Sequence, residues 1–205
     1  RVVRERGRLM QAAVPAGKGA MAVVLGLEAD AVAALCEEAS GGEVVAPANY
    51  NGGGQIAISG AKDAVARARA LAEQRGAKRV LDLPVSAPFH CELMRPAAEG
   101  LKKVLSEVEV HQFLVGVVAN VDAEVNLKPD RVKTLLIEQA VLPVRWEESM
   151  RWLRGELVEG FVELGPGKVL RGLRRTIDPA ALSWNVEDPD SRAATRTALA
   201  GAGRT

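Results

Sequence analysis

The sequence has 205 residues, 48% of them hydrophobic, which is enough to bury a core as one large domain or two small ones. Its 27 lysine and arginine residues against 26 aspartate and glutamate residues give a net charge of +1, so no global field steers the chain to DNA or to an anionic membrane. Only 3% of the residues are aromatic, and few side chains could stack on nucleic-acid bases. Neither nucleic acid nor a membrane is therefore expected as a partner.

The two cysteines, Cys36 and Cys91, are too few for a disulfide framework or a Cys-X-X-Cys metal site. We find no signal peptide and no apolar stretch of membrane-spanning length, so we expect a soluble protein of the reducing cytoplasm. The chain opens at RVVRERGRLMQ, without an initiator methionine and within a pattern typical of a basic amphipathic helix. We therefore expect it to be a fragment of a longer protein.

Residues 19–86 contain six elements whose lengths and turn signals agree. Apolar residues at helical spacing or in short β-branched runs, separated by glycines, predict them. They are a strand over 20–27, a helix over 29–40, strands over 44–51 and 55–60, a helix over 62–76 and a strand over 79–85. The order β-α-β-β-α-β is the split βαβ pattern, which predicts a ferredoxin-like unit.

From Pro88 onward, helices alternate with short apolar strands. The expected elements are a helix over 93–108, a strand over 113–120, helices over 130–141 and 145–153, and a strand followed by a helix over 160–177. Such alternation indicates an α/β fold whose sheet has parallel strands. Residues 187–205 are polar and rich in alanine, which predicts a short helix that frays.

One of only two histidines, His90, stands beside Cys91 in the stretch PVSAPFHCELM. Pro84 and Pro88 restrict this loop, and loop residues on a rigid scaffold are where catalytic side chains tend to lie. Composition alone favours the other interpretation, an ordinary histidine at the surface or the core edge. Adjacent side chains point in different directions, so we expect Cys91 to pack in the core and not to act as a nucleophile served by His90.

Three other features have a structural and a functional interpretation. Residues 165–168, Gly-Pro-Gly-Lys, lack the Walker spacing, and they indicate either an anion site at a helix start or an ordinary helix start. Asn49 and Gln55 flank a triple glycine, where turn formation alone explains them. Arg6 precedes Gly7 within a helix, where glycine costs about 1 kcal/mol relative to alanine. This cost suggests that another segment approaches Gly7 closely.

Six blocks, read in order, carry a resemblance to a known family: RERGRLMQAAVPAGKGAMA, PANYNGGGQIAISG, GAKRVLDLPVSAPFHCELM, ANVDAE, LPVRWEESM and ELGPGKVL. Together they resemble the malonyl-CoA:acyl-carrier-protein transacylase family of fatty-acid synthesis over nearly the whole chain. The resemblance implies a partial α/β-hydrolase-like acyltransferase domain with an inserted ferredoxin-like subdomain. Residues 19–86 would form the small subdomain, and residues 1–18 and 87–205 would form the remainder of the large one.

The resemblance also assigns a role to His90. In this family the nucleophile is a serine in a Gly-His-Ser-X-Gly elbow, and neither this motif nor the family's GQGxQ segment, which gives an oxyanion-hole glutamine, occurs in the 205 residues. His90 matches the general base of that serine in a ping-pong acyl transfer. Gln139 matches the residue whose backbone carbonyl orients the histidine, although Ala140 and Val141 depart from the usual pattern. The chain alone is therefore expected to be inactive.

Substrate residues follow from the same resemblance. Arg6 matches the arginine that binds the malonyl carboxylate, for which a planar guanidinium is suited because it can donate two parallel hydrogen bonds. Asn49 and Gln55 match the substrate-side loop, where Gly53 replaces a proline common in the family. The resemblance implies no cofactor and no metal, with malonyl-CoA and phosphopantetheinyl acyl carrier protein as substrates.

An acidic acyl carrier protein is the partner that the resemblance implies, and the protein is expected to be a monomer. Lys168, Arg171 and Arg175 recur at helical spacing and could form a basic docking face, or simply a solvated one. Two alternatives remain at this point. The chain could belong to the acyltransferase domain of a polyketide synthase, or it could be a non-catalytic remnant that binds the carrier protein.

Overall fold

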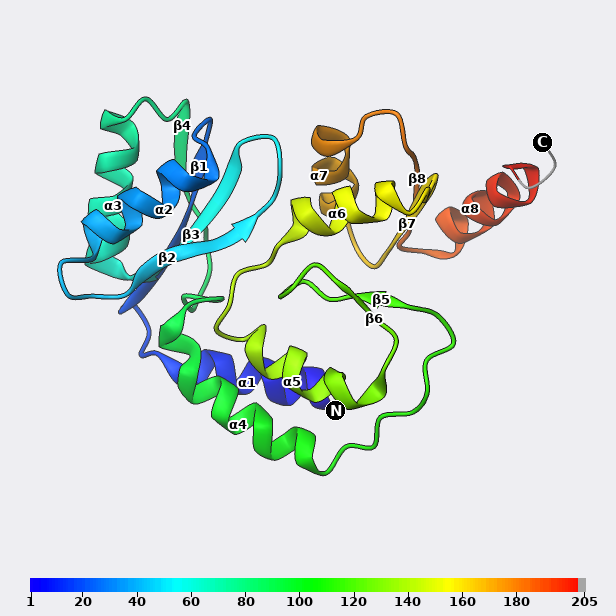
Figure 1. Cartoon of the computed structure of the whole chain (residues 1–205), viewed down its shortest axis with the longest axis horizontal. Coiled ribbons are helices and arrows are strands. Elements are labelled where there is room, and N and C mark those ends of the chain that lie inside the picture. The colour runs from blue at the N-terminus through cyan, green and yellow to red at the C-terminus, as the bar shows by residue number, and fades with distance from the viewer. Residues whose placement is uncertain (203–205) are drawn as a thin grey trace. The chain divides into compact units, whose positions relative to one another are not determined.

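The computed structural model describes residues 1–202, which divide after Ser149 into two compact units (Figure 1). The first unit contains the elements α1 (Val2–Ala13), β1 (Gly19–Leu25), α2 (Ala29–Ser40), β2 (Val45–Tyr50), β3 (Gln55–Ala61), α3 (Lys62–Gln74), β4 (Arg79–Asp82), the short 3₁₀ helix η1 (Glu92–Met94), α4 (Arg95–Ser106), β5 (Val117–Val118), β6 (Val125–Asn126) and α5 (Pro129–Glu138). Helix α6 (Trp146–Gly155) crosses from this unit into the next. No helix in residues 1–202 combines the length and the apolar character that crossing a membrane requires.

Strands β1 to β4 form one antiparallel sheet in the order β2-β3-β1-β4. This confirms the β-α-β-β-α-β order predicted for residues 19–86. Side chains alternate between the faces of a strand, so Ala22 and Val24 pack with α2 and α3, whereas Met21 and Val23 lie on the opposite face. That opposite face also packs against Phe89, the residue before His90.

The turn between β2 and β3 depends on its three glycines. Gly52, Gly53 and Gly54 have φ angles of 87°, 62° and 70°, in the left-handed region that glycine adopts without a steric penalty. The Gln55 amide donates to the Gly52 carbonyl at 3.1 Å, and the turn closes there. Its conformation thus explains why glycine, and not proline, stands at position 53.

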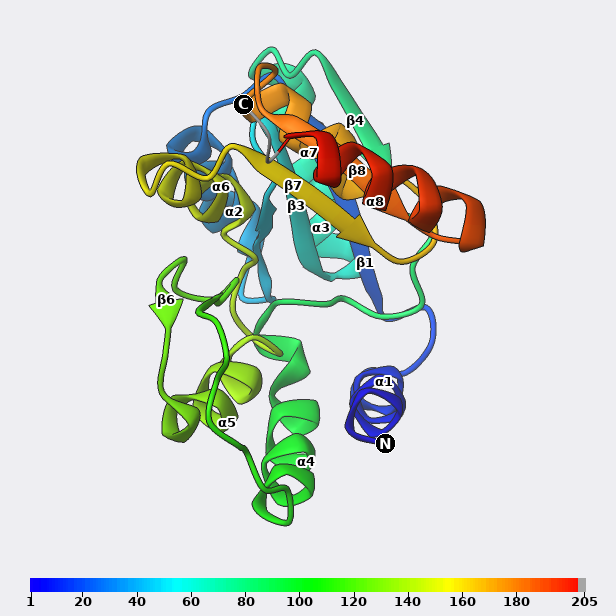
Figure 2. The same ribbon diagram turned by 90° about the vertical axis from the view of Figure 1, so that its right-hand side faces the viewer.

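Helices α1 and α4 pack side by side through a second core. The core consists mainly of Met10, Val14, Ala87, Met94, Ala97, Ala98, Ala140 and Val141. Figure 2 shows α1, α4 and α5 gathered at one end of the four-stranded sheet. The residues that link α5 to α6 then pair with the edge strand β2, because the Val144 amide donates to the Ala48 carbonyl and the Tyr50 amide donates to the Val144 carbonyl, both at 2.8 Å.

The second unit contains β7 (Gly160–Leu164), α7 (Val169–Ile177), β8 (Leu182–Val186) and α8 (Pro189–Ala202). Strands β7 and β8 pair in parallel, from Gly160 opposite Leu182 to Leu164 opposite Val186. We expected a sheet of parallel strands after Pro88. Among the strands of residues 1–202, β7 and β8 are the only pair that is parallel, so the expected sheet is present only as this pair. The helix expected in the tail is present as α8.

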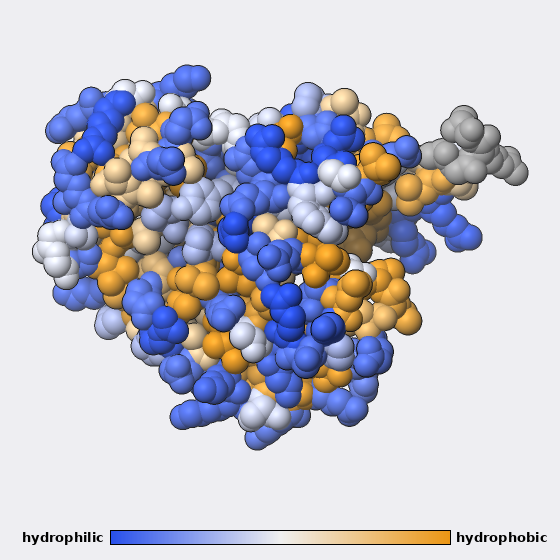
Figure 3. All heavy atoms as spheres, in the orientation of Figure 1, coloured by the Kyte–Doolittle hydropathy of each residue, from blue (hydrophilic) through white to orange (hydrophobic). Residues whose placement is uncertain are grey.

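The strand expected over residues 113–120 is wrong in extent. Only Val117–Val118 forms a strand, and it pairs antiparallel with Val125–Asn126. Leu114 is fully exposed and Val115 is 74% exposed. Figure 3 shows hydrophobic residues at the surface among hydrophilic ones. An apolar run indicates burial but supplies no backbone partner, and a ladder forms only where a second strand can exchange hydrogen bonds.

Candidate active site

His90 lies in the loop between β4 and η1, and its backbone is strained. Its φ angle is 59°, in the left-handed region that residues with a side chain rarely adopt. Such strain persists only where the surroundings hold it, and it clusters at functional sites. Pro88 is fully buried against β1, where a Cβ on Gly19 would lie only 2.4 Å from the Pro88 ring. The loop is therefore fixed on one side of the histidine.

The ring of His90 is oriented by the end of α5. Its Nδ1 donates to the backbone carbonyl of Gln139 at 2.9 Å, across 49 positions of sequence. Gln139 is the C-cap of α5, and the last carbonyls of a helix have no partner within the helix. A carbonyl can only accept, so the proton is on Nδ1 and Nε2 is left with a lone pair. This is the tautomer that a general base needs at Nε2.

The surroundings of His90 favour the neutral ring. Burial lowers the pKa of His90 from its ordinary value near 6.5, and the positive charge of Arg6 lowers this pKa further. The carbonyls of Gln139 and Leu142 oppose this, because accepting a hydrogen bond from the ring stabilises the imidazolium. Since the net direction is downward, the ring is mostly neutral at pH 7.

Arg6 lies in α1 and is half-buried, and burial lowers its pKa. Within residues 1–202 its guanidinium has no hydrogen-bond or ion-pair partner, whereas Arg8, two residues further along the same helix, pairs with Glu5 at 3.0 Å. A partly desolvated cation without a counter-ion is suited to bind an anion. The close approach expected at Gly7 is not found, since a Cβ there would meet nothing within 4 Å among the described residues.

We predict that His90 titrates below pH 6.5 and that Arg6→Gln raises its pKa, because the substitution removes a neighbouring positive charge. The pKa can be measured from the ring chemical shifts as a function of pH in the 205-residue chain, where the exposed His111 gives the only other histidine signal. Arg8→Gln is the matched control and should leave the His90 titration unchanged. A His90 pKa at or above 6.5, or one unaffected by Arg6→Gln, would contradict this account.

Cys91 has the surroundings of a packing residue. It is 1% exposed, its thiol donates to the Pro88 carbonyl at 3.2 Å, and it accepts from the Ser59 hydroxyl at 3.6 Å. Burial raises the pKa of this thiol, which disfavours the reactive thiolate. These contacts agree with the packing role expected of Cys91. No hydroxyl or thiol of the described residues forms a hydrogen bond with the His90 ring.

Asn49 and Gln55 share one face of the sheet. Asn49 lies opposite Ala57, and Gln55 lies two residues before Ala57 on the same strand, so all three side chains point to the face that packs against Phe89. Both polar side chains are half-buried and have no hydrogen-bond partner in the described part of the chain. The fold thus brings them to the side of the sheet where the histidine loop lies, but neither forms a hydrogen bond with His90.

The three basic residues at positions 168, 171 and 175 do not form one helical face. Helix α7 begins at Val169, so Lys168 precedes it, and its ammonium lies 3.5 Å from the Glu187 carboxylate. Arg171 and Arg175 do lie one turn apart in α7, and both are exposed. Spacing alone could not reveal where the helix begins, and that position separates the lysine from the two arginines.

Carboxylates of the protein itself occupy the start of α7. The Glu163 side chain accepts hydrogen bonds from the amides of Leu170 and Arg171, at 3.0 and 2.9 Å, and Glu187 accepts one from Gly167 at 3.0 Å. These are the donors that an external phosphate would need. Of the two interpretations of Gly-Pro-Gly-Lys, the structure favours an ordinary helix start.

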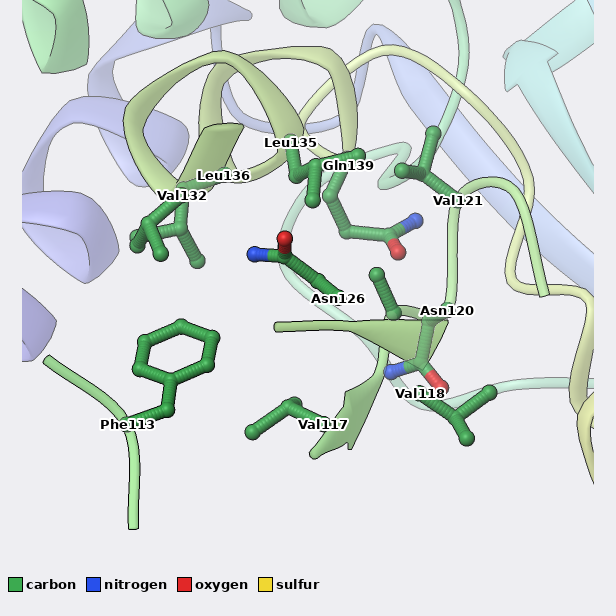
Figure 4. Close-up of a pocket in the computed structure, with 11 residues that line it drawn as sticks. Phe113, Val117, Val118, Asn120, Val121, Asn126, Val132, Leu135, Leu136 and Gln139 are labelled. Atoms are coloured by element: carbon green, nitrogen blue, oxygen red, sulfur yellow. The ribbon is translucent and has the colours of Figure 1, made fainter. Parts of the chain in front are cut away.

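Sequence reasoning missed a cavity of about 380 Å³ beside Gln139. Its walls are mostly apolar and it is lined by Phe113, Val117, Val118, Ala119, Asn120, Val121, Asn126, Val132, Leu135, Leu136 and Gln139 (Figure 4). The amides of Asn120, Asn126 and Gln139 supply its polar groups. Periodicity could not have found it, because β5, β6 and α5 enclose it only after they have folded. In the described part of the chain, no group of three His, Cys, Asp or Glu residues could hold a metal ion.

No protein-family model matches the chain. Its sequence is 43% identical over 194 residues to the malonyl CoA-acyl carrier protein transacylase of Escherichia coli, covering 95% of this chain and 63% of that protein. Among solved structures it is similar to an acyl carrier protein S-malonyltransferase from Vibrio cholerae, with 47% identity and a TM-score of 0.91, covering 95% of this chain and 63% of that one.

A second solved structure similar to this chain is a complex of a type II PKS acyl-carrier protein with its malonyl-transacylase. The identity is 40% and the TM-score 0.89, over 93% of this chain and 62% of that one. The chain therefore spans about 63% of the length of the first curated relatives that it matches.

Proposed function

Because the chain belongs to the malonyl CoA-acyl carrier protein transacylase family, we propose that it supplies the general base and the acyl-selecting cation of an enzyme that transfers a malonyl group from coenzyme A to acyl carrier protein. The observation that carries this proposal is the 2.9 Å hydrogen bond from His90 Nδ1 to the Gln139 carbonyl. It leaves Nε2 free to take a proton, in a loop whose strained backbone is held in place.

The nucleophile in this proposal is a serine hydroxyl that is not among the 205 residues. His90 Nε2 takes the hydroxyl proton as the serine oxygen attacks the thioester carbonyl of malonyl-CoA. The carbon–sulfur bond then breaks, the imidazolium returns its proton to the coenzyme A thiolate, and the malonyl group remains as a serine ester. In the second half-reaction His90 deprotonates the pantetheine thiol of the carrier protein, the thiolate attacks the ester, and the serine recovers its proton.

The lowered pKa of His90 supports the role of a base. A base must be unprotonated before it can accept a proton, and both burial and Arg6 keep the ring neutral near pH 7. A depressed pKa also makes the imidazolium a better acid once it has formed, which helps the thiolate leave. The same ring therefore serves both proton transfers.

Arg6 is the residue that we propose distinguishes malonyl from acetyl. Malonyl differs by a free carboxylate, and a guanidinium can hold a carboxylate through two parallel hydrogen bonds. The absence of any partner for Arg6 within residues 1–202, together with its electrostatic effect on His90, supports this assignment. Asn49 and Gln55 would line the substrate side of the site from the sheet face that bears Phe89.

The remaining parts of the proposal concern organisation and partners. Residues 19–86 would form the small subdomain, and residues 1–18 and 87–205 would form part of the large one. A carrier protein of acidic surface would dock on exposed basic residues, for which Arg171 and Arg175 remain candidates and Lys168, already paired with Glu187, is a weaker one. The reaction exchanges one thioester for another and needs no cofactor.

Intact-mass spectrometry after incubation with malonyl-CoA tests the function. The 205-residue chain alone should gain no malonyl group, because it has no Gly-His-Ser-X-Gly serine. A full-length transacylase in which these residues replace the matching region should gain one malonyl group and pass it to phosphopantetheinyl acyl carrier protein. Stoichiometric acylation of the chain alone would redirect attention to Cys91, and a full-length protein that transfers nothing would overturn the proposal.

A further inference from the structure

The side chain of Gln139 stabilises the loop of residues 139–144, which also contains the Gln139 carbonyl that contacts His90. Its amide Nε2 donates hydrogen bonds to the backbone carbonyls of Leu142, at 3.0 Å, and Pro143, at 3.3 Å. The Gln139 backbone carbonyl meanwhile accepts from His90 Nδ1 at 2.9 Å. Gln139 therefore contacts His90 through its backbone carbonyl and stabilises residues 139–143 through its side-chain amide.

Backbone hydrogen bonds hold both ends of this loop, whereas its middle is held by the Gln139 side chain. At one end the Leu142 amide donates to Glu138 at 2.9 Å, and at the other the Val144 amide donates to Ala48 at 2.8 Å. Pro143 has no amide hydrogen and cannot pair. Among the described residues, Gln139 is the one side chain that donates to both carbonyls, since the His90 ring acts on that of Leu142 but not on that of Pro143.

The length and chemistry of glutamine match this role. Its amide is a donor that reaches three and four residues ahead, whereas a glutamate of the same length could only accept, and it would place a negative charge against two carbonyls. A backbone carbonyl for His90 could come from any residue at position 139. Donating to the two carbonyls that follow requires a donor of this length.

We propose that Gln139 is a positioning residue for His90. By donating to the Leu142 and Pro143 carbonyls, its side chain keeps the Gln139 backbone carbonyl within hydrogen-bond distance of His90 Nδ1. The proton of the neutral ring therefore stays on His90 Nδ1, and His90 Nε2 stays unprotonated. The catalytic consequence rests on the proposed function, but the effect on the ring does not. The Leu142 carbonyl, which the Gln139 side chain also holds, acts on the ring as well and raises the pKa of His90, against the lowering by burial and by Arg6.

The test compares Gln139→Met, which keeps the length of the side chain and removes the donor, with Glu138→Met in the 205-residue chain. Glu138 is the neighbouring exposed residue at the end of the same helix, and its side chain makes no hydrogen bond or ion pair within residues 1–202. The ring nitrogen chemical shifts of His90 report which nitrogen carries the proton and at what pH the ring titrates. The shifts of His111 and the thermal unfolding midpoint show whether the fold is intact.

Gln139→Met should change the ratio of the two neutral tautomers of His90 by roughly two- to ten-fold in favour of the form with the proton on Nε2, as expected for a weakened hydrogen bond. It should also lower the pKa of His90, and Glu138→Met should do neither. Gln139→Glu, which also lacks the donor, should shift the tautomer ratio in the same direction as Gln139→Met, although its negative charge opposes the fall in the His90 pKa. It gives a second, polar variant if the methionine variant fails to fold.

Three results would overturn the proposal: a His90 ring unchanged in an intact Gln139→Met protein, an equal change in Glu138→Met, or a His90 tautomer ratio in Gln139→Glu that matches the wild type. In a full-length transacylase that carries these residues, Gln139→Met should lower kcat with little change in KM. If the unmutated full-length protein transferred no malonyl group, the proposed function would fail while the result on the ring would stand.

Discussion

His90→Ala, made in a full-length transacylase that carries these residues, is expected to lower malonyl transfer by about 100- to 10,000-fold, the loss typical of removing a general acid-base. The serine hydroxyl would then have no neighbouring group to take its proton at neutral pH. Turnover of malonyl-CoA with excess carrier protein measures the effect. The thermal unfolding midpoint should change little by comparison, because the ring is only partly buried.

The histidine at position 111 provides the control. His111 is exposed and its only partner among the described residues is Glu109, at 3.7 Å, so His111→Ala should leave turnover unchanged. If His90→Ala retained near-normal turnover, the base would have to be sought elsewhere. If both variants lost activity together with stability, the loss would reflect folding and not proton transfer.

Arg6→Ala is expected to weaken the preference for malonyl over acetyl in the same full-length protein. A lost charge-assisted contact of about 1.5 to 3 kcal/mol corresponds to roughly a 10- to 150-fold fall in kcat/KM for malonyl-CoA. Transfer of acetyl should hold or rise, since that substrate has no carboxylate and the positive charge near the base has been removed. Arg6→Lys should recover little, because an ammonium lacks the planar fork.

The effect of Arg6 on the base has to be separated from its effect on the substrate. Arg6 lowers the pKa of His90, so Arg6→Ala should move the acid limb of the pH–rate profile to higher pH. Both substrates should be compared well above the ordinary histidine pKa of 6.5, where the ring is neutral in wild type and variant alike. Arg8→Ala is the matched control, and an unchanged ratio of malonyl to acetyl kcat/KM in Arg6→Ala would show that Arg6 is not the selector.

Local signals were sufficient for most of the secondary structure. The helix expected over residues 29–40 is α2, with the same bounds, because the spacing of its apolar residues and the glycine pair after Ser40 act within a few positions of one another. The order of strands and helices over residues 19–86 is likewise set by alternation and turns that the sequence displays directly. The family resemblance then added His90, Gln139 and Arg6 as a set, although no local pattern connects them.

Only the tertiary structure decided which residues meet. His90 and Gln139 are 49 positions apart, and their hydrogen bond forms because the end of α5 packs beside the loop after β4. Glu163 and Glu187 fill the donors at the start of α7, and the apolar run before β5 finds no partner strand; both outcomes depend on neighbours that a sequence window does not contain. Periodicity and capping arise from interactions over a few residues, so the sequence reveals them, whereas the free energy of a contact between distant residues depends on packing that exists only in the folded chain.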